Sequence, residues 1–272
     1  MDTAPKIACI IRTHRYDDLR RFEEALASAL GQDDVDVTAF VLAQRPEPQA
    51  LERLQQVCNW LSGIHARPCR IIPVHEGPAD ARTHMLNVAL RHIKADGDFD
   101  AFGVLDSDDA LLSGAYLTLY DAMRRDRARI SFARVYAADV APCDGYDRMF
   151  RLSSPWSGRS KSELMKGNFA PIHSYLVSLE GDTSHLSYNE DYLRLEDYEF
   201  LVRIASSERI TFRSINTHVG LYKFYANEEN STPRTSDSPA SLSEKKALWD
   251  EYREKVMDFR STLKVQFWAG EF

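Results

Sequence analysis

The sequence has little cysteine, no long apolar run and no surplus of positive charge. Its four cysteines show no CxxC or Cys/His ligand spacing, which argues against a disulfide framework or a zinc site. No apolar run approaches the roughly 20 residues of a membrane-spanning helix, and the first residues lack the pattern of a secretory signal. The formal net charge is -7, whereas nucleic-acid binding usually needs a basic stripe. We therefore expect no nucleic-acid partner and a cytoplasmic protein in reducing surroundings.

Three motifs with well-understood chemistry are also missing. No GxGxxG follows the first predicted strand and no GxxxxGK[ST] occurs anywhere, so dinucleotide-binding and P-loop proteins lose their main support. No GxSxG marks a serine nucleophile. What the chain does have is a hydrophobic share of 44% and an aromatic share of 11%, which can supply a sizeable core. At 272 residues we expect one large domain or two small ones.

Strands and helices alternate through the first half of the sequence. Short apolar runs typical of buried strands lie at residues 6–11, 35–42, 70–74 and 99–105. Apolar side chains recur at helical spacing over residues 16–30, in the segment after Pro48, and over residues 79–93. This alternation predicts an α/β protein with a mostly parallel, doubly wound, Rossmann-like sheet, flanking helices and right-handed crossovers.

The second half of the sequence is less regular. We expect helices over residues 113–124 and 198–205, strands over 130–137, 209–213 and 217–225, and a long loop over 141–162. Residues 226–243 are nearly all polar and are predicted to be flexible. Residues 244–272 are predicted to contain a C-terminal helix with an apolar stripe. That stripe is expected to pack on the main domain, and a homodimer through the helix is the alternative.

The most informative motif is Asp106-Ser107-Asp108-Asp109, which directly follows the apolar run at residues 99–105. Three carboxylates at the end of a buried strand repel one another, and a divalent cation with a bound phosphate relieves that repulsion. Hard oxygen ligands suit Mg²⁺ or Mn²⁺. The carboxyl ends of strands are also where open α/β sheets bind ligands. Taken alone, the tetrapeptide is equally compatible with a polar turn.

Four stretches of the chain resemble, in the same order, motifs of the family 2 nucleotide-sugar glycosyltransferases with the GT-A fold. They are residues 10–15 with the helix ending at 25–32, residues 77–90, residues 103–109 and residues 195–204. The third looks like the DXD element of that family and the fourth like its ED element. Residues 167–174 also resemble the acceptor-side segment of the family. The resemblance implies a GT-A glycosyltransferase domain over residues 1–225.

The chain departs from the family pattern at three places. Arg12-Thr13-His14-Arg15 stands where many members have Pro-Thr-Tyr-Asn, and Ala43-Gln44 stands where many have an acidic residue. Near the end of the domain, Tyr222-Lys223-Phe224-Tyr225 replaces a Tyr-Arg pair with a nearby histidine. These departures concern contacts to the nucleotide base and to the phosphates more than the fold.

The resemblance implies roles for particular residues. The resemblance puts Asp108 on the metal, with Asp106 nearer the ribose or the water shell of the metal. His218, which lies in a predicted strand, is a candidate third metal ligand. The implied nucleotide-sugar contacts are Thr13, His14, Gln44, Arg82, Asn87, Asp106, Ser107 and Lys223. Asp197 is the implied general base, with Glu196 as its supporting neighbour. The plainer interpretation of both acidic residues is that they cap the helix that follows, where carboxylates are favourable.

The function that the resemblance implies is transfer of a hexosyl group from a nucleoside-diphosphate sugar to a hydroxyl of a glycan or lipid-linked acceptor, with inversion and with Mn²⁺ or Mg²⁺. Two alternatives stay open: a non-catalytic GT-A-like module that binds a nucleotide sugar, and a sugar nucleotidyltransferase. A lipid-linked acceptor would bring the protein into peripheral contact with the inner face of a membrane. The aromatic pair Phe267-Trp268 is a hint of such contact.

Overall fold

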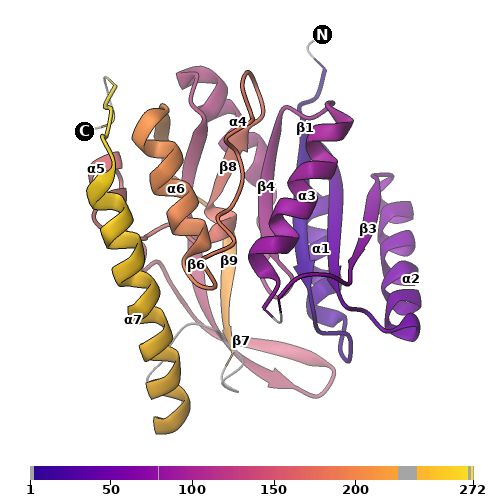
Figure 1. Ribbon diagram of the computed structural model, residues 1–272. Helices are drawn as coiled ribbons and strands as arrows, with labels where there is room; N and C mark the ends of the chain where they lie inside the picture. The colour runs from indigo at the N-terminus through magenta and orange to yellow at the C-terminus, as the bar shows by residue number, and fades with distance from the viewer. Residues whose placement is uncertain (1–2, 79, 226–237, 269–270, 272) are drawn as a thin grey trace.

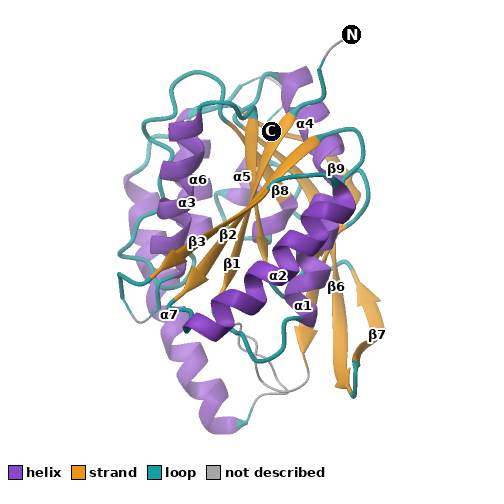
Figure 2. Ribbon diagram, turned by 90° about the vertical axis from the view of Figure 1, so that its right-hand side faces the viewer, coloured by secondary structure: helices purple, strands orange, loops and turns teal. Residues whose placement is uncertain are grey.

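A sheet of nine strands runs through the molecule, with helices on both faces (Figures 1 and 2). The computed structural model describes residues 3–78, 80–225, 238–268 and 271. The strand order is β3-β2-β1-β4-β8-β6-β9-β5, and β7 pairs with β6 outside this path. The α/β class predicted from the alternating pattern is confirmed.

The first half of the chain forms the parallel part of the sheet. Its elements are β1 (Lys6–Thr13), α1 (Arg20–Leu30), β2 (Asp36–Gln44), α2 (Pro48–His65), β3 (Cys69–Val74), α3 (Arg82–Asp96) and β4 (Ala101–Asp106). Strand β1 pairs in parallel with β2 and β4, and β2 with β3. All seven elements were predicted from periodicity. Only their ends differ: the first helix begins at Arg20, and the third begins at Arg82.

The second half adds a mixed set of strands. Its elements are β5 (Ala110–Leu111), α4 (Ala115–Asp126), β6 (Ile130–Cys143), β7 (Tyr146–Ser153), α5 (Lys161–Leu164), the 3₁₀ turn η1 (Ile172–Ser174), β8 (Tyr175–Ser178), α6 (Glu196–Ser207), β9 (Ile210–Tyr225) and α7 (Pro239–Thr262). Strand β8 is antiparallel to both β4 and β6, while β6 and β9 are parallel. The sheet is therefore mixed: β8 runs antiparallel to its neighbours and separates the parallel strands β1–β4 from the parallel pair β6 and β9.

The loop predicted over residues 141–162 is wrong in its first part. Strand β6 continues to Cys143 and turns back as β7, with Gly145 in the turn at φ 76°. A positive φ in a tight turn favours glycine. The strand pattern was not visible in the sequence because most of β7 is exposed to solvent. The two strands predicted over 209–213 and 217–225 are one strand, β9, whose register against β6 shifts repeatedly.

Two apolar clusters fill the space between the sheet and its helices. Helices α3, α6 and α7 cover one face and α1, α2 and α4 the other (Figure 2). Within α7, Tyr252 and Val256 are buried in the same cluster as α6. This helix begins at Pro239, inside the segment predicted to be flexible; residues 226–237 of that segment lie outside the described residues. None of the described helices combines the length and apolarity needed to cross a membrane.

The end of the chain is tied back to the domain by a buried ion pair. Lys161 is fully buried, and its Nζ lies 2.9 Å from a carboxylate oxygen of Glu271. The same ammonium donates to the carbonyls of Glu208 and Gln266, each at 3.0 Å. Glu271 in turn accepts a hydrogen bond from the backbone N–H of Ile210 at 2.7 Å. The C-terminal residues therefore close over the start of β9.

One edge of the sheet collects the ends of elements from both halves of the chain. Strands β1, β2, β4, β6 and β9 run in the same direction, so their carboxyl ends share an edge, at the bottom in Figure 1. The starts of β8 and α6 approach the same edge. Open α/β sheets bind ligands outside these carboxyl ends.

Candidate functional site

A buried arginine joins two of the motifs found in the sequence. Arg12 lies near the end of β1, next to Asp106 in the register of β4, and is 7% exposed. Its Nη2 donates to Oδ1 of Asp106 at 2.6 Å and its Nη1 to Oε1 of Glu196 at 3.2 Å. The DXD-like and ED-like motifs thus meet across one guanidinium. Arg12 was not among the residues predicted to act at the site, although an arginine near the end of a buried apolar strand was a usable signal.

This contact keeps Asp106 ionised. Burial by itself raises the pKa of Asp106, but the charge and hydrogen bond of Arg12 outweigh it and hold that pKa below its usual value. The effect is reciprocal. Burial lowers the pKa of Arg12, whereas Asp106 and Glu196 raise it further than burial lowers it. The site therefore contains a permanent positive charge between two carboxylates.

Asp108 and Asp109 have different surroundings. Burial and then the charge of Asp106 raise the pKa of Asp108 to about 6. Asp109 is 2% exposed; its Oδ1 accepts from the backbone N–H of Lys223 at 2.8 Å, and His173 Nδ1 lies 3.3 Å from its Oδ2. Burial raises the pKa of Asp109 well above its usual range. Asp109 therefore links the end of β4 to β9, and Asp108 is the more accessible carboxylate.

Asp197 lies in the first turn of α6, beside Glu196. Burial and then the charge of Glu196 raise the pKa of Asp197 to about 7. Its Oδ1 accepts from the backbone N–H of Tyr198 at 2.8 Å, and Asn168 donates to its Oδ2 at 3.5 Å. Leu195, just before the helix, has φ 59°, a strained backbone for a branched side chain and one that often accompanies functional sites. A carboxylate that titrates near neutral pH is suited to proton transfer.

The carboxylates at the end of β4 are chemically suited to bind a divalent cation. Asp106 and Asp108 offer hard oxygen atoms, and their mutual repulsion is of the kind that a bound cation relieves. In the part of the chain that the structure describes, no group of three or more His, Cys, Asp or Glu side chains is arranged to hold a metal. Protein sites for Mg²⁺ often use one or two carboxylates together with substrate phosphates. These two residues match that pattern.

His218 does not join this pair. Its ring stacks on Tyr136 with centroids 3.8 Å apart, and its Nε2 lies 3.0 Å from Oγ of Ser154. It belongs to the middle of β9, opposite Arg134 of β6. The His218 ring is engaged with Tyr136 and Ser154, and among the described residues it forms no group of three possible ligands, so the prediction of His218 as a third metal ligand is not supported.

Several residues predicted to contact the nucleotide lie at the ends of β1 and β2. Thr13 is buried at the end of β1, His14 follows it, and Gln44 ends β2. The hydroxyl of Tyr16 bridges the two strand ends by donating to the carbonyls of Gln44 at 2.7 Å and Thr13 at 3.2 Å. Ser107 lies in the neighbouring turn after β4. The structure thus brings the four predicted residues to the same sheet edge.

The surroundings of His14 are positively charged. Burial lowers the pKa of His14, and the charges of Arg15, Arg82 and Arg12 lower it further. Arg82 itself, at the start of α3, forms a bidentate pair with Asp80 at 2.9 and 2.7 Å. Arg194 donates to the same aspartate at 2.7 Å. Two arginines on one carboxylate leave a net positive charge, which suits an anion such as a diphosphate.

Two other predicted contacts are engaged elsewhere. The Asn87 side chain donates to the carbonyl of Tyr188 at 2.9 Å and accepts from the N–H of the same residue at 2.8 Å. Its amide therefore holds the loop before α6. Lys223 is 4% exposed, and its Nζ lies 2.6 Å from Oε2 of Glu24 on α1. The sequence could not predict either contact, because Asn87 and Tyr188, like Lys223 and Glu24, are far apart in the sequence.

Comparisons with known proteins identify the fold. No protein-family model and no curated protein matches the chain. Among solved structures, S. aureus TarS 1-349 with UDP-GlcNAc matches with a TM-score of 0.61 and 14% identity, over 94% of this chain and 71% of that one. The mannosyltransferase PcManGT from Pyrobaculum calidifontis, solved with GDP-Man and Mn²⁺, matches with a TM-score of 0.56 and 11% identity, over 94% and 73%. The protein has a GT-A-type fold. It spans 44% of a longer TarS structure, with which it shares 14% identity.

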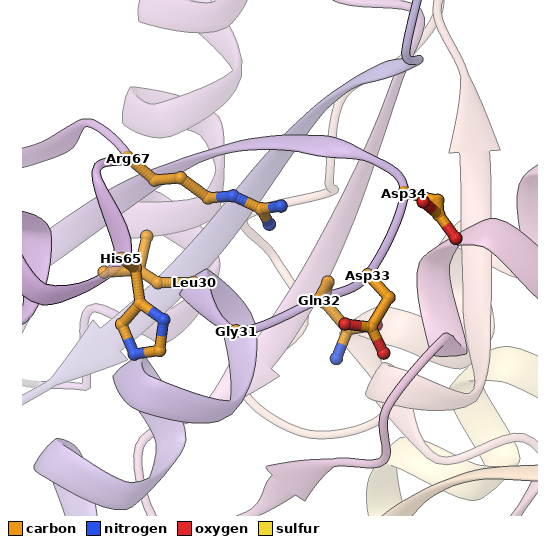
Figure 3. A pocket seen from close by; sticks show the side chains of 7 residues that line it. All are labelled: Leu30, Gly31, Gln32, Asp33, Asp34, His65 and Arg67. Atoms are coloured by element: carbon orange, nitrogen blue, oxygen red, sulfur yellow. The ribbon is translucent and has the colours of Figure 1, made fainter.

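The GT-A-type fold also presents a shallow pocket at its opposite end. Its lining residues are Leu30, Gly31, Gln32, Asp33, Asp34, His65 and Arg67 (Figure 3). They belong to the ends of α1 and α2 and the turns that follow, where the chain returns to the amino ends of β2 and β3. None of the residues predicted from sequence lies here. We therefore place the candidate site at the carboxyl edge, around Arg12.

Proposed function

We propose that this protein is an inverting, metal-dependent glycosyltransferase that moves a hexosyl group from a nucleoside-diphosphate sugar to a hydroxyl of a glycan or lipid-linked acceptor. The observation that carries this proposal is the junction at Arg12, where Asp106 and Glu196 meet, with Asp197 following Glu196 in the first turn of α6. Structural neighbours solved with UDP-GlcNAc and with GDP-Man and Mn²⁺ support the choice of donor and cofactor.

The donor side of the mechanism rests on Asp106, Asp108 and the surrounding arginines. Asp108, with Asp106, would hold Mn²⁺ or Mg²⁺, which when bound stabilises the negative charge of a departing diphosphate. Arg82 adds a planar guanidinium that matches phosphate geometry. Thr13, His14, Gln44 and Ser107 are assigned to the nucleoside, since they end the neighbouring strands at this edge. Lys223 on β9 is paired with Glu24 and is therefore given no role at the phosphates.

The acceptor side rests on Asp197. Its carboxylate removes the proton from the acceptor hydroxyl as that oxygen attacks the anomeric carbon, and a single in-line displacement inverts the configuration. Glu196 accepts a hydrogen bond from Arg12, and its proximity contributes to the raised pKa of Asp197. A base with a pKa near the working pH is effective in proton transfer.

Calorimetry tests the donor site first. We would titrate UDP, GDP, CDP and dTDP, with and without Mn²⁺, into the wild type and Asp108→Ala. The proposal expects one nucleotide to bind in a metal-dependent manner and the variant to lose that binding. Absence of binding for all four nucleotides would overturn the donor-site assignment.

A transfer assay then separates the proposal from its two alternatives. With the sugar nucleotide of the preferred base, the proposal expects sugar transfer or slow hydrolysis that Asp197→Asn removes. Binding without any turnover would identify a non-catalytic binding module. Release of pyrophosphate from a nucleoside triphosphate and a sugar phosphate would identify a nucleotidyltransferase instead.

A further inference from the structure

We infer that Arg12 is a positioning residue that holds the donor-side carboxylate of Asp106 and the acceptor-side carboxylate of Glu196 in one fixed arrangement, an inference that rests on the proposed function. Asp106 lies 94 residues and Glu196 184 residues from Arg12 in the sequence. Both meet the same guanidinium, one on each terminal nitrogen. Within the described residues, Nε of Arg12 is buried with no hydrogen-bond partner. Among the described residues, the hydrogen bonds of this side chain therefore go to these two carboxylates.

Stability does not account for a charged residue at this position. Residues 7–11 of β1 are apolar and fully buried, and Arg12 interrupts that series. Arg12 and Glu196 are buried charges, whereas the Asp106 side chain is 33% exposed. Burying such charges carries a desolvation cost that their attraction often only balances, and apolar side chains of similar volume frequently do as well. The position of Arg12 is better explained by the geometry that it imposes on Asp106 and Glu196 than by a contribution to folding stability.

The bridge fixes the first turn of α6 against the end of β4. Without a cation between them, Asp106 and Glu196 would repel each other across a buried space. With Arg12, their combined charge falls from two negative charges to one, and close approach becomes favourable. Asp197 follows Glu196 in the same turn, so its position relative to the end of β4 depends on this bridge. One oxygen of Asp106 is bonded to Arg12, which leaves the other oxygen to face a ligand.

This arrangement predicts that Arg12 affects transfer more than donor binding. Only one oxygen of Asp106 is held by Arg12, and Asp108 supplies the second carboxylate of the donor site, so nucleotide affinity is expected to fall less than the transfer rate when Arg12 is replaced. Displacement of Asp197 by about 1 Å is enough to cost on the order of 100-fold in rate, because proton transfer needs hydrogen-bond geometry. A lysine retains the charge but lacks the planar fork that reaches two carboxylates together.

The test uses Arg12→Met, Arg12→Lys, Glu196→Gln and the double variant Arg12→Met/Glu196→Gln. The control is Arg70→Met, because Arg70 is a half-exposed arginine paired with Asp96 on the amino side of β3. For each variant we would measure kcat and KM for transfer, the Kd of the preferred nucleotide and the midpoint of thermal unfolding. The control should match the wild type in all four.

The inference expects Arg12→Met to lower kcat about 100-fold while the nucleotide Kd changes less than about threefold. Arg12→Lys should recover about tenfold of the lost kcat and stay about tenfold below the wild type, since the charge is restored but the planar fork is not. Glu196→Gln should cost much less in the Arg12→Met background than in the wild type, as coupled residues are not additive.

Three results would overturn the inference. The first is a folded Arg12→Lys or Arg12→Met variant with wild-type kcat. The second is an equal loss of nucleotide binding and kcat, which would make Arg12 part of the donor site only. The third is additive effects of Arg12→Met and Glu196→Gln. If Arg12→Met does not fold, the test rests on Arg12→Lys: a reduced kcat supports the inference and a wild-type kcat overturns it. A wild type without any turnover would instead overturn the proposed function, and the positioning role with it.

Discussion

At the scale of single residues, Asp197, the proposed general base, carries a cost in stability. Its pKa in the folded protein is raised to about 7, above that of an unfolded aspartate. The folded state therefore holds its proton more tightly than the unfolded state. Stability linked to this group is present below the unfolded pKa and is lost as pH rises through about 7.

Replacement of Asp197 by Asn removes that cost. We predict that Asp197→Asn has a higher unfolding midpoint than the wild type at pH 8 by about 2 °C or more, and that the difference disappears near pH 4. Thermal unfolding across this pH range measures it. An Asn variant less stable than the wild type at pH 8 would show that the carboxylate of Asp197 is not strained in the folded state.

The same residue predicts the pH dependence of transfer. The proposed base must be ionised, so kcat/KM of the wild type should fall as pH drops below about 7. Asp197→Asn should lower kcat by about 100-fold or more at every pH and lose this acidic limb. Rates measured from pH 5 to 9 check it, with Arg70→Met as the control. A wild-type profile that is flat between pH 5 and 8 would contradict the assignment of the base.

At the scale of elements, the site depends on close packing between β9, β5 and the turn before β8. A Cβ on Gly220 would lie 2.6 Å from Cδ2 of His173 and 2.9 Å from the carbonyl oxygen of Ala110. His173 is buried next to Asp109, and burial lowers its pKa to about 4, so it stays neutral. Only glycine at position 220 leaves room for this histidine.

We predict that Gly220→Ala destabilises the protein by about 1–3 kcal/mol, because the added methyl group overpacks a buried contact. The matched control is Gly63→Ala in α2, where a Cβ meets nothing within 4 Å. That change should be stabilising by up to about 1 kcal/mol, since alanine is the better helix former. Urea unfolding measures both. Equal effects of the two substitutions would refute the packing argument.

At the scale of the whole molecule, the C-terminal residues act as part of the domain. The pair of Lys161 and Glu271 is almost completely buried and bonds to the start of β9. Loss of one partner leaves an uncompensated buried charge, which typically costs about 3–5 kcal/mol. We predict a loss of that size for Glu271→Ala in chemical denaturation. Asp98→Ala, which breaks the exposed pair with Lys6, should change stability by less than about 1 kcal/mol.

The elements that could be predicted are those whose secondary structure is encoded in their own short stretch of sequence. The strands and helices up to β4 were correctly predicted, because each carries its own apolar period and its own turn residues. The antiparallel β8, the β6–β7 hairpin and the continuous β9 were not, because β8 has four residues, β7 is largely exposed and β9 is irregular against β6. Their strand character comes from pairing with distant segments rather than from their own pattern.

The sequence by itself determined the alternating α/β architecture, the order of the motifs and the chemical character of Asp106, Asp108, Glu196 and Asp197. These follow from local periodicity and residue type, which are properties of short segments. Only the tertiary structure decided that Arg12 joins two motifs, that Asn87 and Lys223 are engaged elsewhere, and that the ring of His218 stacks on Tyr136. Each of those outcomes depends on which distant side chain occupies the neighbouring space, and that is fixed only when the sheet assembles.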